Sequence, residues 1–73
     1  MSALNRKVYT VRGSEDGVIG VFSTKAKAMA RAIQYAKADR YEFDALVIDT
    51  DSKYINTVAS PDVYADVEEF RVQ

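Results

Sequence analysis

The chain contains no cysteine and no histidine. Without cysteine it can form neither a disulfide nor a thiolate zinc site. Without histidine it lacks the side chain that most often serves as a general base or metal ligand near neutral pH. Catalysis would depend on carboxylates, hydroxyls, Lys, Arg or Tyr alone. We therefore expect no enzymatic activity, no cofactor and no metal site.

Long apolar segments are also missing from the 73 residues. The N-terminus lacks the apolar run of a signal peptide, and no segment reaches the length of a transmembrane helix. We therefore expect a cytoplasmic protein with no membrane partner. A hydrophobic fraction of 48% argues against disorder over most of the chain. The length fits one small domain over residues 1–73, with residues 1–5 flexible.

Only three glycines and one proline interrupt the chain, and they fall between regularly patterned segments. Alternating β-branched and aromatic residues predict strands on both sides of GSEDG, which supplies an Asp-Gly hairpin signal. Three further strands are expected in the second half, and the most apolar of these is expected at the centre of the sheet. The predicted strands span 6–12, 18–22, 43–49, 54–59 and 67–73, of which 43–49 is the most apolar.

An alanine-rich helix is predicted from Lys25 to about Ala38, with Ser23 or Thr24 as its N-cap. Apolar residues at helical spacing predict one face that packs on the sheet. The members of this predicted packing face are Phe22, Ala26, Met29, Ala30, Ile33 and Ala36. A second, shallow face, available to a partner or to a second copy, would consist of Ala28, Ala32 and Tyr35.

The element order β-β-α-β-β-β predicts an α+β fold. We expect a single two-layer domain in which one amphipathic helix packs on a mainly antiparallel sheet of four to five strands. Pro61 separates the last two strands and would lie in a loop or in the first turn of a short helix.

The net charge of −1 hides a strong asymmetry between the two halves of the chain. Residues 1–40 carry eight basic and three acidic residues, a net of +5, whereas residues 41–73 carry two basic and eight acidic residues, a net of −6. This split indicates either partner binding or two halves that pack together and neutralise each other.

Three patterns only superficially suggest chemistry. GVIGVFSTK (17–25) places glycines, hydroxyls and a lysine before the helix, but its spacing does not match a phosphate-binding P-loop. Asp49 and Asp51 begin a calcium-loop pattern that lacks the later glycine and glutamate, so we expect a turn with local hydrogen bonds. Glu68 and Glu69 would point to opposite faces of a strand and could not act as an acid/base pair.

The basic side of the helix raises the alternative of nucleic-acid binding. Lys27 and Arg31 lie one turn apart, flanked by Lys25 and Lys37, which would allow a few phosphate contacts. The acidic second half would repel a nucleic-acid backbone unless its acids face away. Nucleic acid is therefore the less favoured partner.

The segment KVYTVRGSEDGVIGVFSTKAKAMARAIQYA, followed later by VEEFRV, resembles small domains of unknown function found largely in bacteriophage genomes. These domains show a first strand, an acidic turn, GVFS, a Lys/Ala-rich helix and a final strand. The resemblance covers residues 8–36 and 67–72, and the intervening DTDSKYINTVASPDVYAD is not part of it. It implies a phage accessory protein that acts by binding, and it supplies no catalytic residues.

Together these observations predict a small non-catalytic interaction module. It would be a phage accessory protein in the host cytoplasm that binds or inhibits a host protein or associates with a second copy of itself. The alternative is a nucleic-acid-binding accessory protein that uses the basic helix. The expected protein-binding residues lie on the helix and in the acidic C-terminal part: Lys27, Arg31, Tyr35, Asp62, Asp66, Glu68 and Glu69.

Overall fold

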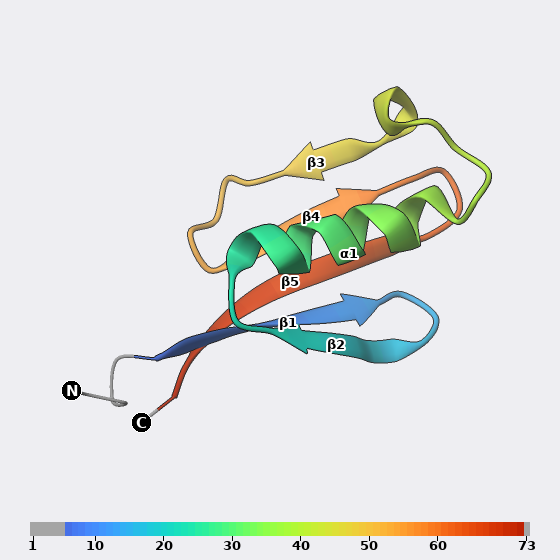
Figure 1. Cartoon of the computed structure of the whole chain (residues 1–73). Coiled ribbons are helices and arrows are strands. Elements are labelled where there is room, and N and C mark those ends of the chain that lie inside the picture. Colours follow the sequence, from blue (N-terminus) through green and yellow to red (C-terminus); the bar gives the residue numbers. More distant parts are fainter. Residues whose placement is uncertain (1–5, 73) are drawn as a thin grey trace.

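The computed structural model describes residues 6–72 and has the predicted α+β architecture, with one helix on one side of a five-stranded sheet (Figure 1). Residues 1–5, predicted to be flexible, and Gln73 lie outside the described residues. The elements are β1 (Lys7–Gly13), β2 (Gly17–Phe22), α1 (Lys25–Lys37), η2 (Phe43–Ala45, a 3₁₀ turn), β3 (Val47–Asp49), β4 (Ile55–Ala59) and β5 (Tyr64–Arg71). Over residues 6–72, none of the helical segments has the length and apolarity needed to cross a membrane.

The sheet is antiparallel throughout, with strand order β2-β1-β5-β4-β3. The prediction that 43–49 is the central strand is wrong, because η2 leaves only Val47–Asp49 to pair, at the edge of the sheet. The last strand takes the central place. It begins earlier than predicted, at Tyr64, and its eight residues are long enough to pair with β1 on one side and β4 on the other.

The β1–β2 hairpin forms where the Asp-Gly step predicts it. Gly17 has a φ of 71°, a left-handed conformation that glycine adopts without steric cost. The pairing register shifts between Val11 and Arg12, where Ile19 is the extra residue on β2. This β-bulge increases the local twist of the edge strand.

The helix also begins and ends close to the predicted residues. Thr24 is the N-cap, and its Oγ1 accepts a hydrogen bond from the Lys27 N–H at 3.2 Å. At the C-terminus no glycine is present, and Ala38 itself takes the left-handed conformation with a φ of 52° while its N–H bonds to the Gln34 carbonyl.

The face of α1 that packs on the sheet agrees in part with the predicted one, because Ala36 is buried and Phe22, Met29 and Ile33 pack against the core. Ala26 and Ala30 are exposed, whereas Ala28 and Ala32 are fully buried together with Ala36. Ala28 and Ala32 of the predicted shallow face are therefore part of the core and cannot contact a partner, and Tyr35 is partly buried against it. From the sheet, this core receives Val11, Val58, Ala65 and Val67. Because alanine occurs on every side of this helix, its apolar pattern could not single out the face that approaches the sheet.

Candidate protein-interaction surface

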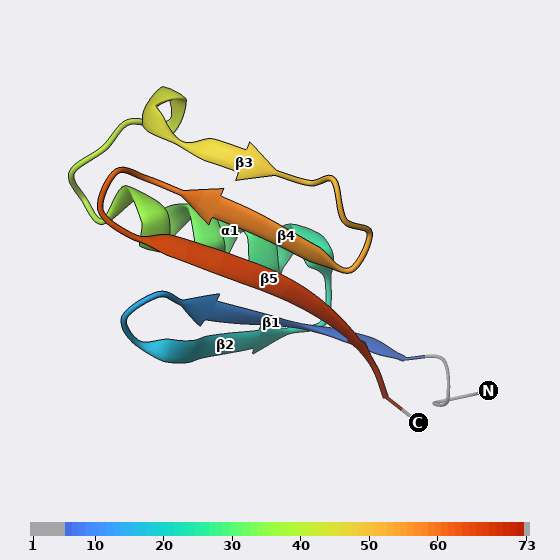
Figure 2. The ribbon, with the colours of Figure 1, turned by 180° about the vertical axis from the view of Figure 1, so that it is seen from behind.

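The helix covers only one face of the sheet. It contacts β1, β2, β4 and β5, and seen from behind, the sheet lies in front of it (Figure 2). Ala65 and Val67 of β5 are buried beneath α1, so the alternating residues Asp66 and Glu68 belong to the other side. Within residues 6–72, no helix or strand packs on that side. We call it the open face, and it consists of the side chains of all five strands that point away from α1.

A polar row crosses the middle of the open face. The strand register places Arg12 opposite Asp66, Asp66 opposite Thr57, and Thr57 opposite Asp49. The Thr57 hydroxyl donates a hydrogen bond to Asp66 Oδ1 at 2.7 Å. Together with Glu68 in the next row, the open face carries three acidic side chains and one arginine, so it attracts cations.

Large apolar side chains stand exposed on both sides of this polar row. Phe70, Ile55 and Val21 lie on one side, with exposed fractions of 44%, 45% and 60%. On the other side lie Tyr64 and Val47, of which Val47 is 69% exposed. A single exposed apolar residue is ordinary, but several on one sheet face, interrupted by charges, are typical of an interaction surface.

The predicted acidic residues of the C-terminal part do not share one surface. Asp66 and Glu68 lie on the open face. Glu69 is on the helix side of the sheet, where the Lys7 ammonium lies 3.7 Å from its carboxylate. As predicted, Glu68 and Glu69 point to opposite faces of their strand.

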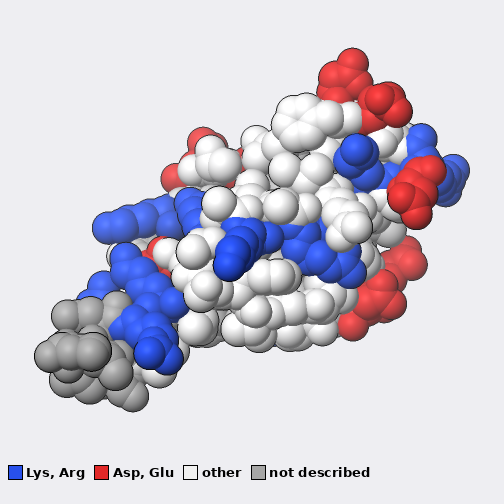
Figure 3. Space-filling model, in the orientation of Figure 1, with Lys and Arg blue, Asp and Glu red and all other residues white. Residues whose placement is uncertain are grey.

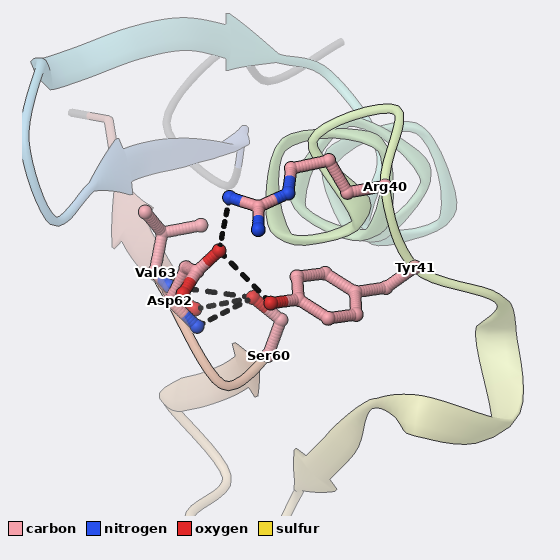
Figure 4. A network of polar contacts seen from close by, with 5 residues as sticks. All are labelled: Arg40, Tyr41, Ser60, Asp62 and Val63. Atoms are coloured by element: carbon pink, nitrogen blue, oxygen red, sulfur yellow. Dashed lines mark hydrogen bonds and ion pairs between the residues drawn. The ribbon is translucent and has the colours of Figure 1, made fainter.

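Asp62 is occupied by a network that joins the end of the helix to the β4–β5 loop (Figure 4). Its Oδ2 lies 2.6 Å from Arg40 Nη1 and accepts a hydrogen bond from the Tyr41 hydroxyl at 2.9 Å. The Ser60 hydroxyl accepts from the Asp62 and Val63 amides and so fixes the loop. The hydrogen bond to Asp62 raises the pKa of Tyr41, with smaller contributions from desolvation and from the carboxylate charge. This arrangement stabilises a turn rather than presenting a free carboxylate.

Tyr35 is likewise engaged within the molecule. A Cβ atom at Gly13 would overlap its ring, which therefore lies directly against the β1 backbone. The Tyr35 hydroxyl donates to Asp16 Oδ2 at 2.9 Å and accepts from the Glu15 amide at 3.2 Å. Tyr35 thus ties the β1–β2 hairpin to the helix, and its hydroxyl is not free for a partner.

The basic residues of the helix lie on the opposite side of the molecule from the open face. Lys27 is exposed, and Arg31 Nη1 donates to the Gln34 side-chain oxygen at 3.2 Å. In the view with α1 in front, Lys and Arg side chains extend across this side, with acids mainly at its margins (Figure 3). Lys27 and Arg31 therefore cannot contact the same flat partner surface as Asp66 and Glu68.

Ion pairs between the two halves of the chain neutralise part of the opposite charges that the halves carry. Lys7 pairs with Glu69 and Arg40 pairs with Asp62, so each of these ion pairs joins residues 1–40 to residues 41–73. β1 and β5 are direct neighbours, which brings opposite charges into one sheet.

The Asp49–Asp51 turn has the local hydrogen bond that its sequence predicts. Asp49 Oδ1 accepts from the Asp51 N–H at 3.0 Å, as in an Asx-turn. In the described part of the chain, no three acidic side chains come together in a group that could hold a metal ion.

Comparison with family models, with curated proteins and with solved structures gave no match to this chain. The open face is therefore identified as a candidate interaction surface from this structure alone. Its apolar members Phe70, Ile55 and Val21 were not among the predicted binding residues. Strand alternation assigns Phe70 to the same side as Glu68, but which side the helix covers depends on contacts distant in the sequence.

Proposed function

We propose that this chain is a non-catalytic protein-interaction module that binds its partner through the open face. The observation that carries the proposal is the group of exposed apolar side chains around Glu68, namely Phe70, Ile55 and Val21. Burial of such side chains by a partner supplies most of the free energy of protein association, while adjacent charges orient the two surfaces.

The charges of the open face define the chemistry of the partner. Asp49, Asp66 and Glu68 outnumber Arg12, so the complementary surface would present apolar side chains beside lysines or arginines. The resemblance to phage-encoded domains supports a host protein in this role, which the module would inhibit by covering the surface it binds.

The test compares capture of host proteins by the wild type and by variants altered on one face only. Phe70→Glu and Ile55→Glu place a carboxylate among the apolar side chains, and each should reduce recovery of the bound protein by at least about tenfold. Lys27→Glu combined with Arg31→Glu changes the opposite side and should leave recovery unchanged. Far-ultraviolet circular dichroism would verify that each variant is folded.

Either of two results would contradict this assignment. A captured protein that persists with Phe70→Glu and Ile55→Glu does not bind the open face. A protein lost only with Lys27→Glu and Arg31→Glu binds the helix side instead.

Nucleic-acid binding by the helix is the second candidate, favoured by the distribution of charge on α1. Lys25, Lys27, Arg31 and Lys37 lie on this helix, which carries no acidic residue. A gel-shift titration at low salt tests it, because phosphate contacts weaken steeply with salt. Absence of retardation at about 100 µM protein, the weak end of non-specific affinities, would exclude it.

A further inference from the structure

The two edge strands of the sheet differ in how far they are protected against pairing with another chain. β3 has only three residues and ends in Asp49, and short, charged edges resist such pairing. β2 has six residues, Gly17–Phe22, with neither a charged residue nor a proline among them. Within residues 6–72, no strand pairs with the outer side of β2.

We propose that β2 pairs antiparallel with β2 of a second copy of this chain, about a two-fold axis, to form one continuous sheet. Such pairing satisfies the outward N–H and C=O groups of both strands. Its hydrogen bonds use the edge of the sheet, and of the apolar residues that carry the proposed partner-binding function it involves Val21 alone, so the two proposals can be tested separately.

The charges at the two ends of β2 favour this orientation. Its N-terminal end follows the acidic hairpin residues Glu15 and Asp16, whereas its C-terminal end leads into the helix at Lys25. A groove of about 840 Å³ at the C-terminal end is also lined by Arg6 and by Lys7, of which Lys7 pairs with Glu69. An antiparallel arrangement sets the acidic end of each copy beside the basic end of the other, whereas a parallel one would set like charges together.

Glu15 and Lys25 are both exposed and are suited to this contact. Within the described residues, neither has an oppositely charged partner within 4.0 Å, since the ion pairs there are Lys7–Glu69 and Arg40–Asp62. By symmetry the Glu15–Lys25 contact would form twice in the dimer.

Side chains next to this edge add apolar contact. Val18 and Val21 lie on the open face and are 53% and 60% exposed. Antiparallel pairing brings Val18 of one copy near Val21 of the other, at the spacing of cross-strand neighbours. The bulge at Ile19 twists the strand and shortens the region that can pair. The resulting interface is smaller than a standard one, so we expect a dissociation constant of about 10–500 µM.

Sedimentation equilibrium of the whole chain from about 10 µM to 1 mM tests the dimer. The average mass should rise from that of a monomer towards that of a dimer, and added salt should weaken association because exposed charges contribute to it. A monomer at about 1 mM would overturn the proposal.

Charge reversal tests the antiparallel orientation. Glu15→Lys and Lys25→Glu, made separately, should each weaken dimerisation by about 3- to 10-fold, because each places like charges at both symmetric contacts. The double variant exchanges the two charges and should return to within about twofold of the wild type. Two weakened single variants without recovery in the double variant would exclude this orientation.

A matched pair of edge variants locates the interface. Val21→Lys places a charge beside the β2 edge and should reduce dimerisation at least about tenfold, whereas Val47→Lys at the β3 edge should leave it unchanged. Equal loss in both variants would place the contact elsewhere. Phe70→Glu should leave the dimer intact, so that failure of the dimer and failure of partner binding at the open face are distinguishable.

Discussion

The fully buried core beneath the helix and the open face of the sheet use side chains of different size. The largest fully buried side chains are Val11, Val58, Val67 and Asn56, and the helix contributes only alanine to the fully buried core. The larger Phe70 and Tyr64 are about half exposed on the open face. Small side chains allow the helix to lie close to the sheet. Larger apolar side chains such as Phe22, Met29 and Ile33 are partly buried around this core, whereas those of the open face remain available for association.

The largest expected change in stability comes from enlarging a side chain between the helix and the sheet. Ala32→Leu inserts a larger side chain into a fully buried site and should lower the free energy of unfolding by about 2–3 kcal/mol. Ala30→Leu, two residues earlier on the exposed side, should change it by less than about 0.5 kcal/mol. Urea denaturation measures both, and equal effects would mean that the helix does not pack through Ala32.

The faces of the helix illustrate why part of this structure could not be predicted. Thr24 and the Asp-Gly step act on their immediate neighbours, so the N-cap and the hairpin were predictable from a few residues. The choice between Ala28 and Ala30 for the core depends on strands that meet the helix from both ends of the chain. Alanine at both positions gives no local signal for that choice.

The order of the strands in the sheet likewise depends on contacts between residues distant in the sequence. The apolar composition of 43–49 predicted a central strand, yet Phe43 and Val47 are exposed, and β5 occupies the centre. Pairing over long sequence separations decided this, and strand propensity does not encode it. Of the predicted binding residues, Asp66 and Glu68 lie on the open face, whereas Asp62 and Glu69 form ion pairs within the molecule.

A smaller effect is expected where the β1 backbone approaches the helix. Gly13→Ala would drive a methyl group into the Tyr35 ring, and displacement of this ring would strain its hydrogen bonds to Asp16 and Glu15. We expect a loss of about 1–2 kcal/mol in the free energy of unfolding.

A double-mutant cycle with Tyr35→Ala identifies the cause of that loss. Once the ring is absent, Gly13→Ala should cost clearly less than it does in the wild type. An unchanged cost in the Tyr35→Ala background would attribute the effect to the β1 backbone rather than to the contact with the helix.

The smallest expected effect on stability concerns the polar network of Arg40, Tyr41 and Asp62 at the end of the helix. Because the hydrogen bond to Asp62 raises the pKa of Tyr41, the protonated phenol is the form that the folded state favours. The stabilisation by this hydrogen bond is fully present below the ordinary tyrosine pKa of about 10 and is lost as the pH rises through the higher folded-state value.

Phenolate absorbance during an alkaline titration measures this shift. Asp62→Ala should return one tyrosine to an ordinary pKa, and Tyr41→Phe should remove the late-titrating phenol altogether, leaving the other four tyrosines of the chain. If Tyr41→Phe instead removes a phenol of ordinary pKa, the contact with Asp62 does not persist in solution. Of the two contacts to Asp62, only the ion pair with Arg40 would then join the β4–β5 loop to the end of the helix. An exposed ion pair contributes little to stability, so this end of the helix would be weakly attached to the sheet.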